Sequence, residues 1–390
     1  MPKLATKEYC TGCTACASVC LKSCIAMTED EAVFLYPVID AERCVDCGLC
    51  EKTCPIVTPL KMAESEPKAY AAYSKDETMR LQSSSGGVFT EIVKIVLAES
   101  GVVFGAAYND QFEVLHICVD SETDLSKLRG AKYAQSNLCG TFADVKERLD
   151  AGQQVLFSGT PCQVGGLKAY LRKDYPNLLT VDFVCHSVPS PMAWQEYVKY
   201  RAEQDNDGKL PTAIDLRSKA TGWSRYQYSN LFQYSNGVNH SAKSTESLYM
   251  KLFVGGYINR KSCANCQFKG YRRVSDLTIG DFWGIWDIAP EMDDNQGTSV
   301  ILTQSSHGAK LLHKINDHLV LREVSLEEAS QQNQAMLKTH TPSERRNDAL
   351  SLIKAGHIAQ CETWFIEKKP SFIRYVWNRV KRLLHKLTYK

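Results

Sequence analysis

The fold of the first part of the chain is decided by two runs, Cys10-Thr-Gly-Cys13-Thr-Ala-Cys16-Ala-Ser-Val-Cys20 and Cys44-Val-Asp-Cys47-Gly-Leu-Cys50-Glu-Lys-Thr-Cys54-Pro55. Both have the spacing C-x2-C-x2-C-x3-C. Steps of two residues let a short loop wrap one metal group with its backbone N–H groups directed at that group. Zinc sites and disulfides also use paired cysteines. Two complete four-cysteine runs favour a pair of iron–sulfur clusters over both alternatives.

The spacing resembles that of bacterial-type ferredoxins, which hold two [4Fe-4S] clusters and take the fourth ligand of each cluster from the other run. The ligands of cluster I would be Cys10, Cys13, Cys16 and Cys54, and those of cluster II would be Cys20, Cys44, Cys47 and Cys50. Leu21 stands where proline is usual, and the four sulfurs of that run remain. Cys24 lies outside both runs, and we expect it to be a small buried hydrophobic residue. The resemblance predicts electron transfer.

Length and composition limit what else the chain can be. With 390 residues, two or three domains are expected, and a hydrophobic fraction of 44% suits a globular core. A net charge of +2 argues against nucleic-acid binding. No apolar signal segment precedes Cys10, and no stretch approaches the roughly eighteen apolar residues of a membrane span. We therefore expect a cytoplasmic protein with reduced thiols, in contact with the inner face of the membrane at most peripherally.

Apolar runs and periodic segments predict the organisation of the chain. Residues 1–60 form the predicted ferredoxin domain, and polar residues 60–68 read as a linker. Two regions of one core follow, 68–145 and 146–345, and then a basic tail, 346–390. Predicted strands lie at 102–107, 114–119, 155–157, 179–184 and 300–302, and predicted helices at 88–98, 164–171, 192–201 and 309–318. The alternation predicts an α/β core, so that the whole chain is α+β.

Four later cysteines could form a further four-sulfur site. Cys162 follows a predicted strand and opens a helix, where the helix dipole favours a thiolate. Cys185 ends another predicted strand, and Cys263 and Cys266 form a C-x2-C pair. A zinc ribbon, a redox-active thiol at Cys162 and buried structural cysteines are the alternatives.

Six motifs occur in an order that resembles one protein family. They are Ser84–Thr90, Arg129–Tyr133, Gly159–Gln163, Cys185-His186, Cys263-x2-Cys266 and Ser275–Asp281. Together they are similar to the coenzyme F420 hydrogenase/dehydrogenase beta-subunit family, over about Lys68 to Ser306. The resemblance implies FAD and a [4Fe-4S] cluster held by Cys162, Cys185, Cys263 and Cys266. With its ferredoxin domain the chain resembles longer members, including those of bacterial surface-polysaccharide gene clusters and plant 7-hydroxymethyl chlorophyll a reductases.

The implied flavin site also has a physical basis in the residues. A Ser/Gly loop leading into a helix can hold a pyrophosphate with backbone N–H groups and hydroxyls. A lysine can bind a phosphate or favour an anionic reduced flavin, and an Asp can accept from a ribose. The candidate cofactor-binding residues are Ser84, Ser85, Gly86, Gly87, Thr90, Lys132, Gly280 and Asp281. A flexible turn, a surface lysine and a turn-capping Asp are the structural alternatives.

His186 and Lys132 are the candidate catalytic residues. His186 follows Cys185, so it could tune a cluster or pass a proton to a substrate, and a structural histidine is the alternative. Arg217, Lys219, Gly222 and Trp223 suggest a loop over the substrate site with basic groups for an acidic or phosphorylated ligand. The alternative is a solvated loop anchored by the Trp.

These features predict an iron–sulfur flavoprotein oxidoreductase. An external electron donor or acceptor such as ferredoxin would exchange electrons with the N-terminal clusters, and FAD would exchange a hydride with a small organic molecule. A sugar or nucleotide-sugar intermediate of surface-polysaccharide synthesis is one candidate. Two alternatives are a strict coenzyme F420 oxidoreductase and a non-catalytic electron-relay subunit.

The tail from Lys368 to Lys390 has eight Lys or Arg residues and no acidic one. Its apolar residues recur at spacings of three and four, so a helix would gather them on one face. They are Ile373, Trp377, Val380, Leu384 and Leu387. This pattern predicts a helix in the interface of an anionic membrane, with a terminal helix docked on the core as the alternative.

Overall fold

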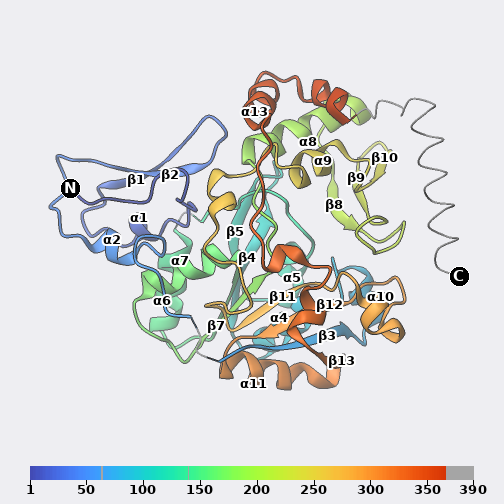
Figure 1. Ribbon diagram of the computed structural model, residues 1–390, viewed down its shortest axis with the longest axis horizontal. Coiled ribbons are helices and arrows are strands. Elements are labelled where there is room, and N and C mark those ends of the chain that lie inside the picture. Colours follow the sequence, from blue (N-terminus) through green and yellow to red (C-terminus); the bar gives the residue numbers. More distant parts are fainter. Residues whose placement is uncertain (63–64, 139, 366–390) are drawn as a thin grey trace, which may run out of the picture.

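An eight-stranded mixed sheet lies at the centre of the computed structural model, which describes residues 1–62, 65–138 and 140–365 (Figure 1). The strand order is β13-β3-β12-β11-β7-β6-β4-β5. The strands are β3 (Lys68–Ser74), β4 (Val102–Tyr108), β5 (Val114–Val119), β6 (Val155–Gly159), β7 (Leu178–Phe183), β11 (Leu277–Asp281), β12 (Ser299–Thr303) and β13 (Leu319–Val324).

The middle of the sheet is parallel, and both margins are antiparallel. Strands β4, β6, β7 and β11 run in the same direction, whereas β5, β12, β3 and β13 each pair antiparallel with a neighbour. The carboxyl ends of the parallel strands therefore meet at one edge of the sheet. In open α/β sheets this edge is where ligands bind.

Alternating side chains of the strands pack under helices on both faces of the sheet. Val103, Leu156 and Leu179 share a buried cluster with α4 (Val88–Ala98) and α11 (Ser306–Ile315). Their neighbours in sequence, among them Phe104 and Phe157, pack with α6 (Thr141–Asp150) and α7 (Pro161–Leu171). The remaining helices at the sheet are α3 (Glu77–Leu81), α5 (Leu125–Leu128), α10 (Ile285–Ile288) and α12 (Leu326–Ser330).

The N-terminal cysteine runs form a small module beside α6 and α7 (Figure 1). It contains α1 (Ala15–Ser18), β1 (Ile25–Glu29), β2 (Leu35–Ile39) and α2 (Leu49–Thr53), and its two strands pair antiparallel. Cys13 belongs to the buried cluster that includes Val164 and Leu167 of α7. Gly166 makes this approach possible, because a Cβ built on it would lie 2.6 Å from Cys13 Cβ.

A second layer carries a three-stranded antiparallel sheet of β8 (Ala213–Ser218), β9 (Ser229–Gln233) and β10 (Asn239–Lys243). It packs with α8 (Pro191–Asn206) and α9 (Leu248–Val254) around an aromatic core that includes Trp194 and Tyr249. The helix α13 (Arg346–Lys354) and the 3-10 helix Ile358–Phe365 join the same buried cluster.

The predicted α+β fold is confirmed, and each predicted strand and helix overlaps an observed one. The sequence patterns did not predict β3, β11, β13, the two strands of the N-terminal module or the three strands of the second sheet. The predicted membrane helix from Lys368 to Lys390 lies outside the described residues. Within the described ranges, no helix combines the length and apolar character that a bilayer crossing requires.

Candidate functional site

The eight cysteines of the N-terminal module gather into two groups. Burial, with smaller contributions from the neighbouring Cys10 and Cys54, raises the pKa of the Cys13 thiol to about 11. Burial also raises the pKa of Cys16, with Cys13, Cys10 and Cys54 adding to the effect. The thiols predicted for cluster I are therefore close neighbours.

Cys24 lies at the second group. It is buried, as expected, but its Sγ is 3.3 Å from Cys20 Sγ. The hydrogen bond with Cys20 raises the pKa of the Cys24 thiol to about 11, and burial and Cys44 contribute. Cys47 is exposed, so this group reaches the molecular surface.

The four later cysteines line one small cavity at the carboxyl edge of the sheet. Cys162 is in the first turn of α7, where Thr160 caps the helix and its Oγ1 lies 3.1 Å from Cys162 Sγ. Cys185 follows β7, and Cys263 and Cys266 lie on and just after the 3-10 helix Lys261–Asn265. Burial raises the pKa of Cys185 and of Cys263 to about 12 each. The predicted four-sulfur set is thus brought together.

Within residues 1–62, 65–138 and 140–365, no three His, Cys, Asp or Glu side chains are arranged to hold a single metal ion. Four thiols at one cavity can in principle hold either a zinc ion or a [4Fe-4S] cluster.

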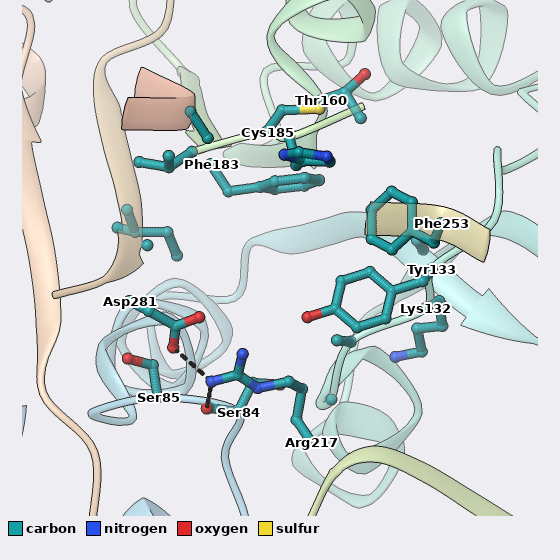
Figure 2. Close-up of a pocket in the computed structure, with 18 of the residues that line it drawn as sticks. Ser84, Ser85, Lys132, Tyr133, Thr160, Phe183, Cys185, Arg217, Phe253 and Asp281 are labelled. Atoms are coloured by element: carbon teal, nitrogen blue, oxygen red, sulfur yellow. Dashed lines mark hydrogen bonds and ion pairs between the residues drawn. The ribbon is translucent and has the colours of Figure 1, made fainter. Parts of the chain in front are cut away.

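A cavity of about 860 Å³ lies next to the thiol site and is lined by most of the predicted cofactor residues. Figure 2 shows Cys185, Thr160 and Phe183 at one end of this cavity and Ser84, Ser85, Arg217 and Asp281 at the other. Tyr133 and Phe253 stand along one side (Figure 2). The cavity therefore combines apolar and aromatic side chains with a small number of polar groups, as cofactor pockets usually do.

The Ser/Gly loop approaches the cavity at the N-terminus of α4, where Gly87 has φ 86° and no side chain caps the helix. Ser84, Ser85, Gly87 and Thr90 line the cavity, but Gly86 does not. A Cβ on Gly86 would lie 2.5 Å from Ala72 O. Gly86 therefore packs the loop against β3, and the predicted contact between Gly86 and a cofactor is not what its position provides.

Arg217 and Asp281 form an ion pair of 2.9 Å on the cavity wall. The Arg217 guanidinium also donates to Ser84 O at 3.3 Å and lies over the rings of Tyr228 and Trp283. Asp281, expected to accept from a ribose, thus has a protein partner. Arg217 Nε is buried without a hydrogen-bond partner among the described residues.

Lys132 lines the cavity with its amine held by backbone carbonyls. Its Nζ donates to Arg129 O at 2.7 Å and to Lys127 O at 2.9 Å. Burial lowers the pKa of Lys132 to about 7. Lys132 is therefore a cation whose charge changes near neutral pH.

His186 lines both the large cavity and the thiol cavity. Its ring packs edge-on against Phe253 and lies 5.1 Å from the ring of His340. Burial lowers the pKa of His186, which keeps the ring neutral. Its Nε2 is buried without a partner among the described residues.

The expected substrate loop is anchored rather than open. Lys219 Nζ donates to Arg80 O and Ser85 O, both at 2.6 Å, and Lys219 is not on the cavity wall. Trp223 is buried and stacks on Trp283. Of the two basic residues predicted for this loop, Arg217 lines the cavity and Lys219 does not. The sequence reading missed Tyr133, Arg260, Lys269 and Arg273, although the density of basic residues around Cys263-x2-Cys266 is a signal for the last three.

The fold and the cysteine groups define an iron–sulfur protein of the oxidoreductase class. A 4Fe-4S dicluster domain matches residues 9–57. The description "Coenzyme F420 hydrogenase/dehydrogenase, beta subunit" matches residues 69–142 with its N-terminal part and 152–329 with its C terminus. The chain belongs to the coenzyme F420 hydrogenase/dehydrogenase beta-subunit family.

Two curated relatives are similar to parts of the chain. One subunit of the F(420)H(2) dehydrogenase of Methanosarcina mazei is 27% identical over 176 residues, which are 42% of this chain and 49% of that protein. Coenzyme F420-dependent sulfite reductase of Methanocaldococcus jannaschii is 28% identical over 170 residues, 43% of this chain and 26% of that protein. The chain thus spans half or less of the length of these relatives. A chain of the F420-reducing [NiFe] hydrogenase complex from Methanosarcina barkeri aligns over 78% of this chain and 92% of its own, with 16% identity and a TM-score of 0.47.

Proposed function

We propose that the chain binds FAD in the large cavity and a third [4Fe-4S] cluster at Cys162, Cys185, Cys263 and Cys266, and acts as an iron–sulfur flavoprotein oxidoreductase. The observation that carries this proposal is that Cys185 and His186 line both cavities. FAD, when bound, connects single-electron carriers to two-electron hydride chemistry. Cys185 and His186 would place the two groups side by side.

The charges of the cavity fit a diphosphate. Arg129, Lys132 and Arg217 line it, and among the described residues of its wall Asp281 carries the one carboxylate. The uncapped N-terminus of α4 adds backbone N–H groups beside Ser84 and Ser85, where an anion is favoured. The buried Nε atoms of Arg129 and Arg217 have no partner in the described part of the chain. We therefore place the phosphates at this end and the redox-active ring at the Cys185 end.

The cavity also offers room and polar groups for a small substrate. Its wall continues to Arg225, Lys251 and Gln332, away from the proposed phosphate site. His186, whose Nε2 has no partner among the described residues, would hold or pass a proton there once a bound molecule reaches it. An external one-electron partner would meet the exposed Cys47 group of the N-terminal module.

A second candidate function is oxidation or reduction of coenzyme F420 itself, which the names of both curated relatives favour. Anaerobic mixing with reduced F420 tests it. Bleaching of the flavin absorbance within seconds is expected if F420 is the substrate, and an unchanged spectrum argues against it. A sugar or nucleotide-sugar substrate stays a prediction.

The main proposal is tested by counting iron, acid-labile sulfide and flavin after anaerobic purification. Three cubane clusters require about twelve irons per chain, together with one FAD. About eight irons with one zinc would assign the four later thiols to zinc. About twelve irons without any flavin would favour the electron-relay alternative.

A further inference from the structure

The proposed third cluster site is enclosed by cations. Arg260, Lys269 and Arg273 line the same cavity as its four cysteines, and among the described residues no Asp or Glu lines it. Arg260 and Arg273 are each only 2% exposed. Buried charges act over a longer range than exposed ones because water and salt screen them less.

The charge of Lys269 has no acidic partner among the described residues, whereas that of Arg273 is partly balanced by the buried Asp182. Lys269 Nζ donates to Cys185 O at 2.5 Å and to Ala335 O at 2.7 Å, and both acceptors are neutral. The ion pair of Arg273 with Asp182 is long, at 3.9 Å. Lys269 is thus joined directly to the residue that separates the two cavities.

Arg260 connects this site to the N-terminal module. Its Nε donates to Cys10 O at 2.8 Å and its Nη2 to Leu35 O at 2.9 Å, and Nη2 lies 3.8 Å from Cys10 Sγ. Its Nη1 donates to Gln135 Oε1 of the core at 2.9 Å. One buried cation is therefore shared between the cluster I thiols and the third site.

The surroundings of the cluster II thiols differ. The charged groups nearby are exposed and of both signs: Asp46 pairs with the N-terminal amine, Glu51 accepts from Lys3 N, and Arg43 donates to Lys22 O. Exposed pairs of this kind contribute little to the local potential. The positive charge thus increases from the surface group towards the large cavity.

We infer that Arg260, Lys269 and Arg273 make the third site easier to reduce than either ferredoxin site, so that electrons entering at the surface group collect beside the large cavity. A four-thiolate cluster gains one negative charge on reduction, and buried cations favour the more negative form. Each transfer moves one electron, which a ferredoxin site loses and the third site gains, and an external one-electron reductant replaces it. The inference rests on the proposed third cluster.

Redox titration of the anaerobic holoprotein, followed by the EPR signals of the reduced clusters, tests it. Lys269→Gln keeps a donor towards the two carbonyls and removes the charge. We expect at least a tenfold lower equilibrium constant for reduction of the most easily reduced cluster, which is about 59 mV for one electron. Lys269→Arg should restore the parent value. Lys261→Gln is the matched control, because Lys261 is exposed and absent from the cavity wall although it is two residues from Cys263.

Arg260→Gln provides a second variant if Lys269→Gln does not assemble. It should lower the reduction potentials of two of the three clusters, because Arg260 contacts Cys10 and lines the third site. The inference would be overturned if the highest reduction potential stayed the same in either variant, or if Lys261→Gln shifted it equally. In both cases three reduction steps in the parent would still support the third cluster. Only two steps in the parent would show that the third cluster itself is absent, and the inference would fall with it.

Discussion

Replacement of Gly166 by alanine tests the contact between the N-terminal module and α7. In a helix interior alanine is normally preferred over glycine by about 1 kcal/mol. At Gly166 the new Cβ would lie 2.6 Å from Cys13 Cβ and 2.9 Å from Cys13 Sγ. Non-bonded carbon atoms keep a distance of about 3.5–4.0 Å, so the module must move by roughly 1 Å. We expect Gly166→Ala to destabilise the module.

The size of the effect follows from two opposing contributions. Overpacking costs about 1–3 kcal/mol, and the upper value applies if Cys13 is a cluster ligand, as we propose, because a ligand cannot turn away. Subtracting the helix preference of about 1 kcal/mol leaves a net loss of about 2 kcal/mol, a factor of roughly thirty in the folded-to-unfolded ratio.

Urea titration of the holoprotein with two signals measures this. The visible absorbance of the clusters should be lost at a lower urea concentration in Gly166→Ala, while tryptophan fluorescence, which reports Trp194 and other core residues, should change little. Gly105→Ala is the control, since the three atoms nearest its Cβ would be side-chain atoms of Leu128 at 3.4 Å or more. Helix preference alone would raise the urea concentration at which half of the clusters are lost in Gly166→Ala. Such a rise would refute the close contact.

Four further predictions concern the proposed cofactor sites and the loop beside them. Cys263→Ser should lose about four irons per chain and keep the EPR signals of the ferredoxin pair; unchanged iron would remove Cys263 from the ligands. Because burial lowers the pKa of Lys132 to about 7, its positive charge is lost as pH rises from 6 to 8, and FAD affinity measured by fluorescence should fall about tenfold in the parent but stay flat in Lys132→Met. The folded-state pKa lies below that of an unfolded lysine, so the Lys132 contribution to apoprotein stability should rise with pH from about 7 upwards, and a stability difference from Lys132→Met that does not vary with pH would contradict this. Gly86→Ala should destabilise the apoprotein by roughly 1–3 kcal/mol in urea titration, because its Cβ would lie 2.5 Å from Ala72 O; parent stability with reduced FAD binding would instead return Gly86 to the cofactor site.

The sequence was most informative where spacing dictates chemistry. The two four-cysteine runs could be singled out because cluster ligands need fixed intervals. The set Cys162, Cys185, Cys263 and Cys266 followed from the order of motifs, and these residues do line one cavity. The alternating strands and amphipathic helices of the core followed from periodicity. By contrast β8 to β10 have polar, irregular sequences, and their pairing depends on tertiary contacts that no local pattern encodes.

Roles that depend on long-range neighbours could not be read from sequence. Gly86 resembles a phosphate-loop glycine, but its close neighbour is Ala72, which another part of the chain supplies. Asp281 resembles a free acceptor until Arg217 is seen beside it. The same applies to Arg260, whose acceptors at Cys10 and Leu35 are more than two hundred residues away in sequence.

Arg260 also limits how the ferredoxin module can be exchanged. Three of its contacts, with Cys10 O, Leu35 O and the face of the Tyr36 ring, are made to that module. A foreign ferredoxin grafted in its place would bury the guanidinium without these acceptors, and an uncompensated buried charge costs about 3–5 kcal/mol. A successful chimera must therefore supply carbonyl acceptors to Arg260 or replace this arginine. The ferredoxin module and the core are thus expected to be exchangeable only together.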